Sequence, residues 1–243
     1  MKVSEIFVSV QGEGLDVGKA ITFLRLTGCN LACEWCDTQY ASRPGSEFKV
    51  LSPKEIIKKI QSFKVPAVSI TGGEPLIQKK ELIALCKLAQ NINYFIDIQT
   101  NGTLYEEVLG SLVDRFSVSP KLTSSGNHFT KRFNKQVWFR YIEQHKKYKN
   151  VTFKFVIQDK KDRNEALNLL NRFPAIRNIK IPIILQPEID VKKAESLETQ
   201  AEALRWLIED NIMDDKTRLK WQGYNLFIIP QIHKYCWGNK RRV

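Results

Sequence analysis

The sequence lacks any apolar run that approaches the roughly 20 residues needed to cross a bilayer. An acidic residue stands among its first five residues, and no apolar block typical of a signal peptide follows. We therefore expect a cytosolic protein with no membrane partner. The length of 243 residues, the apolar fraction of 43% and the charged fraction of 26% are ordinary for a globular protein with a substantial core.

Histidine is scarce, and disulfide bonds are not expected. The three histidines, His128, His145 and His233, are scattered and form no visible dyad or triad. The five cysteines would stay reduced in the cytosol, which argues against a disulfide framework. Three of the five fall within eight residues, and this crowding needs a chemical explanation.

The charge is strongly positive, because 38 lysines and arginines face 26 aspartates and glutamates, a net charge of +12. Such an excess is compatible with nucleic acid, phosphorylated ligands or an acidic protein partner. The basic residues are spread widely, and the short clusters at 145–149 and 240–242 match no nucleic-acid-binding pattern. We therefore expect solvated, lysine-rich helix faces and no nucleic-acid partner.

Strand-like and helix-like segments alternate along the chain. Runs rich in β-branched and aromatic residues predict strands at 20–26, 67–70, 94–98, 115–118, 151–157, 179–185 and 226–229. Ser52, Pro53 and Glu55 form an N-cap, first-turn proline and capping-box pattern that predicts a helix start. Further helices are expected from Leu104 and around 82–89, 135–147, 164–173 and 197–208.

These strand–helix units, about six of them, predict a parallel sheet with right-handed crossovers and hence an α/β fold. Six units are too few for a closed eight-stranded barrel, so a partial barrel and an open doubly wound sheet both fit. No linker, repeat or low-complexity segment divides the chain, which predicts a single domain over residues 1–243. Nearly every glycine-, proline- or cysteine-rich motif follows a strand, so the motifs should converge on the edge where parallel sheets bind ligands.

Cys29, Cys33 and Cys36 have the spacing C-x3-C-x2-C on one predicted loop. Thiolates this close together suit a metal centre. A closed zinc site would need a fourth ligand, whereas Cys86 lies in a predicted helix face and Cys236 near the far end, and both are assigned to packing. Three thiolates fit a four-iron cluster with one iron left open to a chelating ligand.

With Trp35 just before its last cysteine, this loop resembles that of the radical S-adenosylmethionine (SAM) superfamily. The resemblance implies a modified partial (β/α)6-type barrel and a [4Fe-4S] cluster whose open iron is chelated by SAM. Reduction would split SAM into methionine and a 5′-deoxyadenosyl radical, with Trp35 near the adenine. The turn Thr71-Gly72-Gly73-Glu74-Pro75 resembles the second motif of the superfamily, and its paired glycines permit a close backbone approach to the methionine moiety.

Further stretches resemble one branch, the 7-carboxy-7-deazaguanine synthase family. They are Ser9–Gly14, Arg25, residues 36–38, residues 119–121 and the tail at 230–241. The resemblance covers essentially the whole chain. It implies a lyase of queuosine precursor biosynthesis that contracts the ring of 6-carboxy-5,6,7,8-tetrahydropterin to 7-carboxy-7-deazaguanine, releases ammonia and regenerates SAM.

The resemblance also implies roles for individual residues. Arg25 would pair with the substrate carboxylate, and Thr38 would bind Mg²⁺ with substrate oxygens and waters completing the shell. The remaining substrate-binding residues are Val10, Gln11, Gly12, Glu13 and Thr71. The residues assigned to cofactor binding are Trp35, Asp37, Gly72, Gly73, Glu74, Ser119, Pro120, Lys121, Gln158 and Gln186.

The implied partners are a second copy of the chain and a flavodoxin or ferredoxin-like reductant, whose acidity would suit the net charge. The basic segment 123–149 carries no motif with a readable role, and His233 lies in the tail that resembles the family's.

Two alternatives stay open. A glycyl-radical activase would share the cysteine loop but would not need the Gln11–Gly14 stretch or Arg25. A zinc-stabilised nucleic-acid-binding protein would use the positive charge, but the sequence lacks its second pair of ligands.

Overall fold

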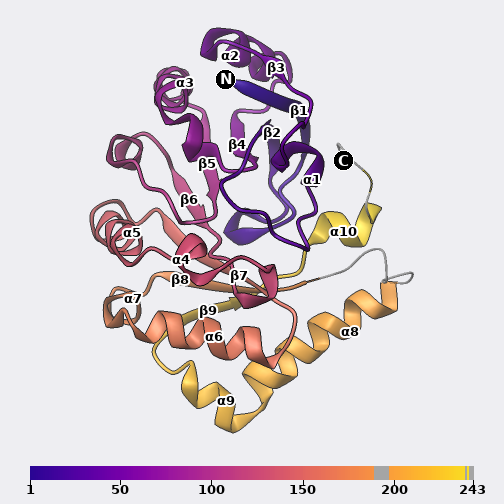
Figure 1. Ribbon diagram of the computed structural model, residues 1–243, viewed down its shortest axis with the longest axis vertical. Coiled ribbons are helices and arrows are strands. Elements are labelled where there is room, and N and C mark those ends of the chain that lie inside the picture. Colours follow the sequence, from indigo (N-terminus) through magenta and orange to yellow (C-terminus); the bar gives the residue numbers. More distant parts are fainter. Residues whose placement is uncertain (189–196, 239, 241–243) are drawn as a thin grey trace.

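The computed structural model describes residues 1–188, 197–238 and 240. Its strands are β1 Lys2–Val10, β2 Ala20–Leu26, β3 Lys49–Val50, β4 Ala67–Gly72, β5 Phe95–Thr100, β6 Arg115–Val118, β7 Val151–Ile157, β8 Pro182–Pro187 and β9 Asn225–Ile228. They form one nine-stranded sheet in the order β3-β1-β2-β4-β5-β6-β7-β8-β9 (Figure 1). Neighbours from β2 to β9 run parallel, whereas β1 is antiparallel to β2 and β3. The sheet is open, as in a partial barrel.

Helices cover one side of this sheet. The longer ones are α2 Pro53–Ser62, α3 Lys79–Asn91, α5 Lys135–Tyr148, α6 Lys160–Asn171 and α8 Leu197–Ile208. The shorter ones are α1 Gln39–Ser42, α4 Phe129–Arg132, α7 Pro174–Asn178, α9 Asp215–Lys220 and α10 Ile232–Trp237. The 3-10 helices are η1 Gly14–Asp16, η2 Pro75–Gln78, η3 Glu107–Ser111 and η4 Thr123–Ser125, and η5 Glu209–Met213 is a short π-helix. In Figure 1 the longer helices follow the convex side, whereas α10 lies on the other side near β1.

The two faces of the sheet differ in polarity, because side chains alternate along each strand. Ile70, Ile98 and Phe155 are fully buried in the core beneath the helices, and burying each such side chain contributes roughly 1.5–3 kcal/mol. The opposite face carries buried polar groups, among them Ser69 and Asp97, which are paired in the β4–β5 register. The sequence therefore places a hydrophobic core outside the curved sheet and a polar interior inside it.

The expected α/β fold with a largely parallel sheet is confirmed. The capping box is present as well, since Ser52 N donates to Glu55 Oε2 at 2.7 Å and Glu55 N donates to Ser52 Oγ at 3.3 Å at the start of α2. No helix among the described residues is long and apolar enough to span a membrane.

The helix expected from Leu104 is wrong, because the structure has only η3 there. Asn150 Nδ2 donates to the carbonyl oxygens of Gly110 and Val113 at 3.2 and 2.9 Å, which draws these acceptors out of a helical ladder. The stretch 123–134, for which no helix was predicted, contains η4 and α4. Strand β1 was not predicted. Residues 189–196, between β8 and α8, lie outside the described residues.

Candidate active site

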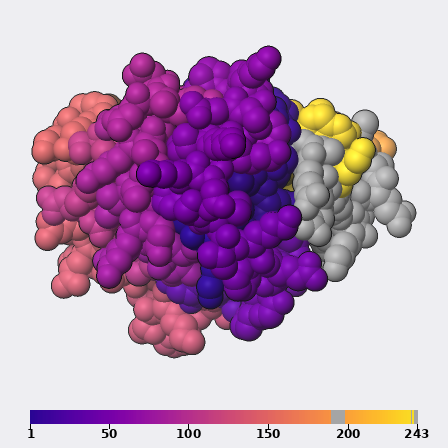
Figure 2. All heavy atoms as spheres, turned by 90° about the horizontal axis from the view of Figure 1, so that it is seen from above, coloured from indigo at the N-terminus to yellow at the C-terminus, as the bar shows by residue number. Residues whose placement is uncertain are grey.

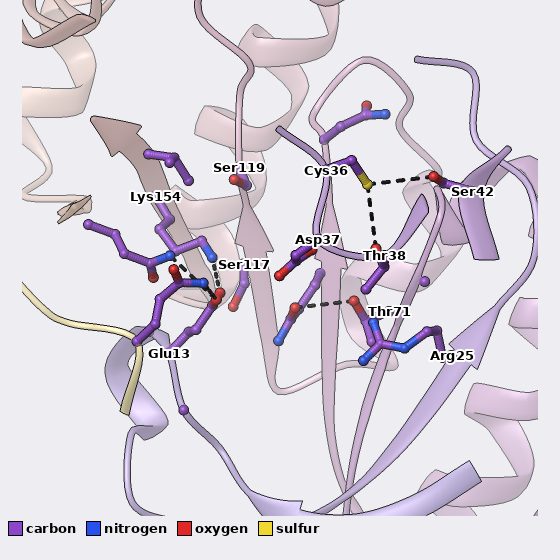
Figure 3. Close-up of a pocket in the computed structure, with 18 of the residues that line it drawn as sticks. Glu13, Arg25, Cys36, Asp37, Thr38, Ser42, Thr71, Ser117, Ser119 and Lys154 are labelled. Atoms are coloured by element: carbon purple, nitrogen blue, oxygen red, sulfur yellow. Dashed lines mark hydrogen bonds and ion pairs between the residues drawn. The ribbon is translucent and has the colours of Figure 1, made fainter. Parts of the chain in front are cut away.

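A pocket on the polar side of the sheet gathers most of the predicted site residues (Figure 3). Its wall includes residues from β1, β2, β4–β8, the cysteine loop and α10. In Figure 3, Cys36, Thr38 and Ser42 lie on one side of the pocket, and Glu13 and Lys154 lie on the other. The predicted residues that line the pocket are Val10, Gln11, Gly12, Glu13, Arg25, Cys29, Cys33, Trp35, Cys36, Asp37, Thr38, Thr71, Gly72, Gly73, Ser119, Lys121 and Gln186.

The three cysteines follow β2, and each sulfur receives polar contacts from a different part of the fold. Cys29 Sγ accepts from Leu31 N at 3.4 Å and from Asn101 Nδ2 at 3.9 Å. Cys36 Sγ lies 3.6 Å from Thr38 Oγ1 and 3.5 Å from Ser42 Oγ. Hydrogen bonds to cysteine sulfurs orient the ligands of iron–sulfur clusters and tune their potentials.

The thiol chemistry fits an iron–sulfur cluster. Burial raises the pKa of the Cys29 and Cys33 thiols, so metal binding would have to supply the free energy that keeps them as thiolates. Within residues 1–188, 197–238 and 240, no three His, Cys, Asp or Glu side chains converge closely enough to hold one metal ion. Three thiols around one pocket suit a cluster, in which each thiolate binds a different iron.

The paired glycines are required by close packing of two backbone segments. A Cβ atom on Gly72 would lie 2.1 Å from Leu26 O, and one on Gly73 would lie 1.8 Å from Gly28 O. Gly72 also has a φ of +126°, a conformation that L-residues rarely adopt. Gly73 N donates to Leu26 O at 3.1 Å. The turn thus holds the start of the cysteine loop against the end of β4.

Glu74, assigned to cofactor binding from the sequence, is completely buried and does not line the pocket. Its carboxylate accepts from Leu76 N at 3.0 Å, Thr100 Oγ1 at 2.9 Å and Asn101 N at 2.7 Å. Burial raises the pKa of Glu74, and these hydrogen bonds lower it again in part. The geometry makes Glu74 a link between the ends of β4 and β5.

Trp35 and Lys121 form another part of the wall. Lys121 Nζ lies 5.4 Å from the centroid of the Trp35 ring and donates to Ser119 Oγ at 3.0 Å. Trp35 Nε1 is buried and has no hydrogen-bond partner within the described part of the chain. An aromatic face beside an ammonium group and an unused donor suits an aromatic ligand that carries a carboxylate.

Glu13 is the most heavily bonded polar group across the pocket. It forms an ion pair with Lys154, and its Oε1 accepts from Gln231 Nε2 at 2.5 Å and from Gln186 Nε2 at 3.4 Å. Burial would raise the pKa of the Glu13 carboxyl, but the charges of Lys154 and His233 and the hydrogen bonds outweigh it and hold this pKa well below its ordinary value. Glu13 is therefore an anion at neutral pH.

Helix α10 brings the C-terminal part of the chain to the same place, and Figure 2 shows its atoms beside those of the N-terminal segment. Ile232 N donates to Gly12 O at 3.0 Å. A Cβ atom on Gly12 would lie 2.2 Å from His233 Nδ1, so only glycine leaves room for that ring. Burial lowers the pKa of His233, and the nearby carboxylates of Glu13 and Asp37 raise it again in part.

Arg25 lines the pocket and also forms an ion pair with Glu5. Its Nε donates to Glu5 Oε1 at 2.7 Å, and Tyr40 Oη donates to the same oxygen at 2.6 Å. The Arg25 side chain remains 15% exposed. Glu5 and Tyr40 therefore fix the Nε edge of the guanidinium in one orientation at the pocket wall.

Comparison with known proteins identifies the family. The model of the radical SAM superfamily matches residues 24–158. The 7-carboxy-7-deazaguanine synthase of Clostridium acetobutylicum is 31% identical over 246 residues, covering 100% of this chain and 99% of that protein. The synthase of Aquifex aeolicus is 31% identical over 233 residues, covering 96% and 91%. This chain belongs to the 7-carboxy-7-deazaguanine synthase family.

The structure of QueE from Escherichia coli has the same fold, with a TM-score of 0.68 and 23% identity over 93% of this chain and 92% of that one. As a radical SAM enzyme of the 7-carboxy-7-deazaguanine synthase family, the chain uses a [4Fe-4S] cluster and SAM. The full-length match to synthases favours neither the glycyl-radical activase nor the zinc-stabilised nucleic-acid-binding protein.

Two other residues assigned to cofactor binding do not line the pocket of this synthase-family chain. Gln158 borders a separate hollow with Asp159 and Asp162, and its backbone N–H donates to Asp162 Oδ2 at 3.0 Å. Pro120 is buried between two residues that do line the pocket. Position after a strand was the sole signal for Gln158, which follows the last residue of β7 and does not line the pocket.

Sequence reasoning missed Lys154, and it assigned no role to Gln231. Lys154 stands between Phe153 and Phe155 in a strand whose other residues are mostly apolar. A lysine at the centre of such a strand must be paired if it is buried, and that signal was available. Its partner, Glu13, lies 141 residues away and cannot be identified from spacing.

Proposed function

We propose that this chain converts 6-carboxy-5,6,7,8-tetrahydropterin to 7-carboxy-7-deazaguanine with release of ammonia, in the cytosol and as a homodimer. The observation that carries the proposal is that one pocket joins the three cysteines to the anionic Glu13 and to Arg25. Radical generation and recognition of a pterin carboxylic acid require those two sets of groups within reach of each other.

Glu13 suits the hydrogen-bonding edge of a pterin, which presents a ring N–H and an amino group. A carboxylate has about four lone-pair positions, so Glu13 can accept from a ligand while it is held by Lys154 and Gln231. Gln186 Oε1 is buried and has no partner among the described residues, because the amide nitrogen faces Glu13. A substrate N–H would satisfy that acceptor.

Arg25 suits the substrate carboxylate at the opposite end. Glu5 engages the Nε edge of the guanidinium, which leaves the planar group pre-oriented for a charge-assisted contact through its other edge. Thr38, beside Cys36, is proposed to bind Mg²⁺ together with substrate oxygens, since one hydroxyl supplies only one of the six oxygen ligands that the ion prefers.

Cys29, Cys33 and Cys36 would hold the cluster, and Trp35, Asp37, Lys121 and the Gly72–Gly73 turn would hold SAM. When bound, the cluster would supply the electron that cleaves SAM, and SAM would supply the radical that abstracts hydrogen from the substrate. The chain itself binds and orients: Lys121 offers a positive charge to the SAM carboxylate, and Trp35 offers a ring face to the adenine. An acidic flavodoxin or ferredoxin-like protein is proposed as the reductant.

The test is an anaerobic assay of protein reconstituted with iron and sulfide, supplied with SAM, dithionite, Mg²⁺ and 6-carboxytetrahydropterin. Mass spectrometry follows both 7-carboxy-7-deazaguanine and 5′-deoxyadenosine, with Cys33→Ala and Arg25→Lys in parallel and magnesium omitted from one series. We expect product from wild type and none from Cys33→Ala. In Arg25→Lys we expect KM for the pterin to rise about tenfold, because lysine cannot reproduce an oriented planar contact.

The outcomes separate the parts of the proposal. Formation of 5′-deoxyadenosine without consumption of the pterin would contradict the proposed substrate. It would still support radical SAM chemistry. If KM for the pterin is unchanged in Arg25→Lys and the melting temperature is lower, Arg25 acts only structurally, through its ion pair with Glu5. Full activity without magnesium would contradict the proposed role of Thr38 in binding Mg²⁺.

A further inference from the structure

Residues 123–134, part of the basic segment to which the sequence assigned no role, pack against the cysteine loop. Glu34 N donates to Ser125 O at 3.1 Å, and Ala32 N donates to Asn127 Oδ1 at 2.9 Å. Two backbone N–H groups of the cysteine loop therefore find their acceptors in residues 125–127. This segment, rather than the cysteine loop itself, determines the path of the chain through Ala32–Glu34.

Asn127 also contacts a cluster ligand directly. Its Nδ2 donates to Cys33 Sγ at 3.3 Å, which is the shortest of the five polar contacts to the three sulfurs among the described residues. The amide orientation follows from its partners: the Ala32 N–H requires the oxygen, and Ser125 O, 3.3 Å from Nδ2, requires the nitrogen. The nitrogen therefore faces the sulfur as a donor.

A buried arginine holds Asn127 in place. Arg132 is 5% exposed and donates to Asn127 O at 3.1 Å, Lys121 O at 2.9 Å and Thr123 Oγ1 at 2.8 Å. Its charge is compensated by Glu165 of α6, whose Oε1 lies 2.7 Å from Arg132 Nη1. The donor to Cys33 is thus fixed to α6 through a continuous set of hydrogen bonds and does not depend on the conformation of an exposed loop.

We propose that Asn127 is a positioning residue for the iron–sulfur cluster, which fixes the Cys33 thiolate and raises the reduction potential of the cluster. A donor to a ligating sulfur stabilises negative charge on it, and the reduced cluster carries more negative charge than the oxidised one. The Asn127 amide accepts from Ala32 N through its oxygen and donates to Cys33 Sγ through its nitrogen. One side chain therefore fixes both the position of the Cys33 ligand and the potential of the cluster. The inference rests on the cluster assigned to the three cysteines and not on the identity of the pterin.

The test compares Asn127→Asp and Asn127→Leu with wild type, and uses Asn168→Asp as a control because Asn168 is exposed on α6. Each protein is reconstituted anaerobically, its iron and sulfide are counted, and the cluster potential is measured by EPR-monitored titration without SAM or pterin. Asp keeps the acceptor for Ala32 N but places a carboxylate against the sulfur. We expect it to disfavour reduction at least tenfold, about 59 mV for a one-electron couple. Asn127→Leu should shift the potential in the same direction.

The proposal would be overturned if both Asn127 variants had the same cluster potential and iron content as wild type and Asn168→Asp. Loss of the cluster from a variant whose thermal unfolding is unchanged would support it, because the fold would be intact. If Asn127→Asp does not fold, Asn127→Ser is measured in the same titration and decides by the same criterion. A wild-type chain that binds no cluster would overturn both this proposal and the proposed function, whereas failure of the pterin assay alone leaves this one untouched.

Discussion

Lys154 and Glu13 form a buried ion pair between the middle of β7 and the loop after β1. Their side chains are only 11% and 15% exposed, so each charge depends on the other for compensation. Removing one partner from such a pair typically costs about 3–5 kcal/mol, because the remaining charge stays buried without a counter-charge. The pair therefore maintains the ionised state of a carboxylate that we assign to substrate recognition.

Lys154→Met should lower the free energy of unfolding by about 3 kcal/mol at pH 8. The loss should shrink as the pH falls. In wild type the depressed pKa of Glu13 gives a contribution that is present above pH 4.5 and is lost only as the pH drops towards the folded-state pKa. Without Lys154, burial would dominate and raise the folded-state pKa of Glu13. The folded state would then be most stable at low pH, where Glu13 is protonated, and would lose stability as the pH rises.

Urea unfolding followed by circular dichroism at pH 5 and pH 8 measures this difference. The double variant Lys154→Met with Glu13→Gln should recover more than half of the loss at pH 8, because no charge remains unpaired. Lys161→Met, at an exposed position on α6, is the matched control and should change little. A loss that is independent of pH and is not recovered in the double variant would show that packing of the lysine stem matters more than its charge.

At the scale of elements, α10 completes the pocket through its contact with Gly12. The contact leaves no room for a methyl group, because a Cβ atom would lie 2.2 Å from His233 Nδ1 and 3.1 Å from His233 N. Gly12→Ala should therefore displace α10 and remove Gln231 from Glu13. We expect faster limited proteolysis after β9 and a KM for the pterin raised about tenfold, with little change in SAM cleavage in the absence of the pterin.

His233→Ala combined with Gly12→Ala is the informative control. It removes the imidazole that a methyl group would strike, so protease resistance should return in part. Equal protease sensitivity in the single and double variants would mean that α10 is held by contacts other than the one to Gly12.

Local signals were enough for some elements and insufficient for others. The capping residues of α2 and the β-branched run of β7 lie within the elements that they form, so both elements were predicted from sequence. In contrast, η3 replaces an expected helix because Asn150, far along the chain, takes its carbonyl groups. The cysteine loop was recognised from spacing, whereas the roles of Lys154 and Asn127 depend on partners more than 90 residues away.

At the scale of the whole molecule, the curved sheet separates two environments. Helices bury the apolar face, and the polar face gathers charged groups from the loop after β1, from β2, from β7 and from α10 around the cysteines. The loop after β1 and helix α10, which are more than 200 residues apart in the sequence, meet at this pocket. The site therefore forms only when distant parts of the sequence have packed, which is why its substrate side was harder to predict than its cluster side.

The net charge of +12 leads to a prediction about electron delivery. An acidic redox protein should be attracted over distances longer than a single contact, and salt screens such attraction, since the Debye length is about 10 Å at 0.1 M. The second-order rate constant for cluster reduction by reduced flavodoxin, measured by anaerobic stopped flow, should fall about tenfold between 50 and 500 mM NaCl. Reduction by a small uncharged reductant should change little over the same range. A rate constant for flavodoxin that does not depend on salt would show that docking is governed by short-range contacts, and that the lysine-rich surface serves solvation, as its even spread along the sequence suggested.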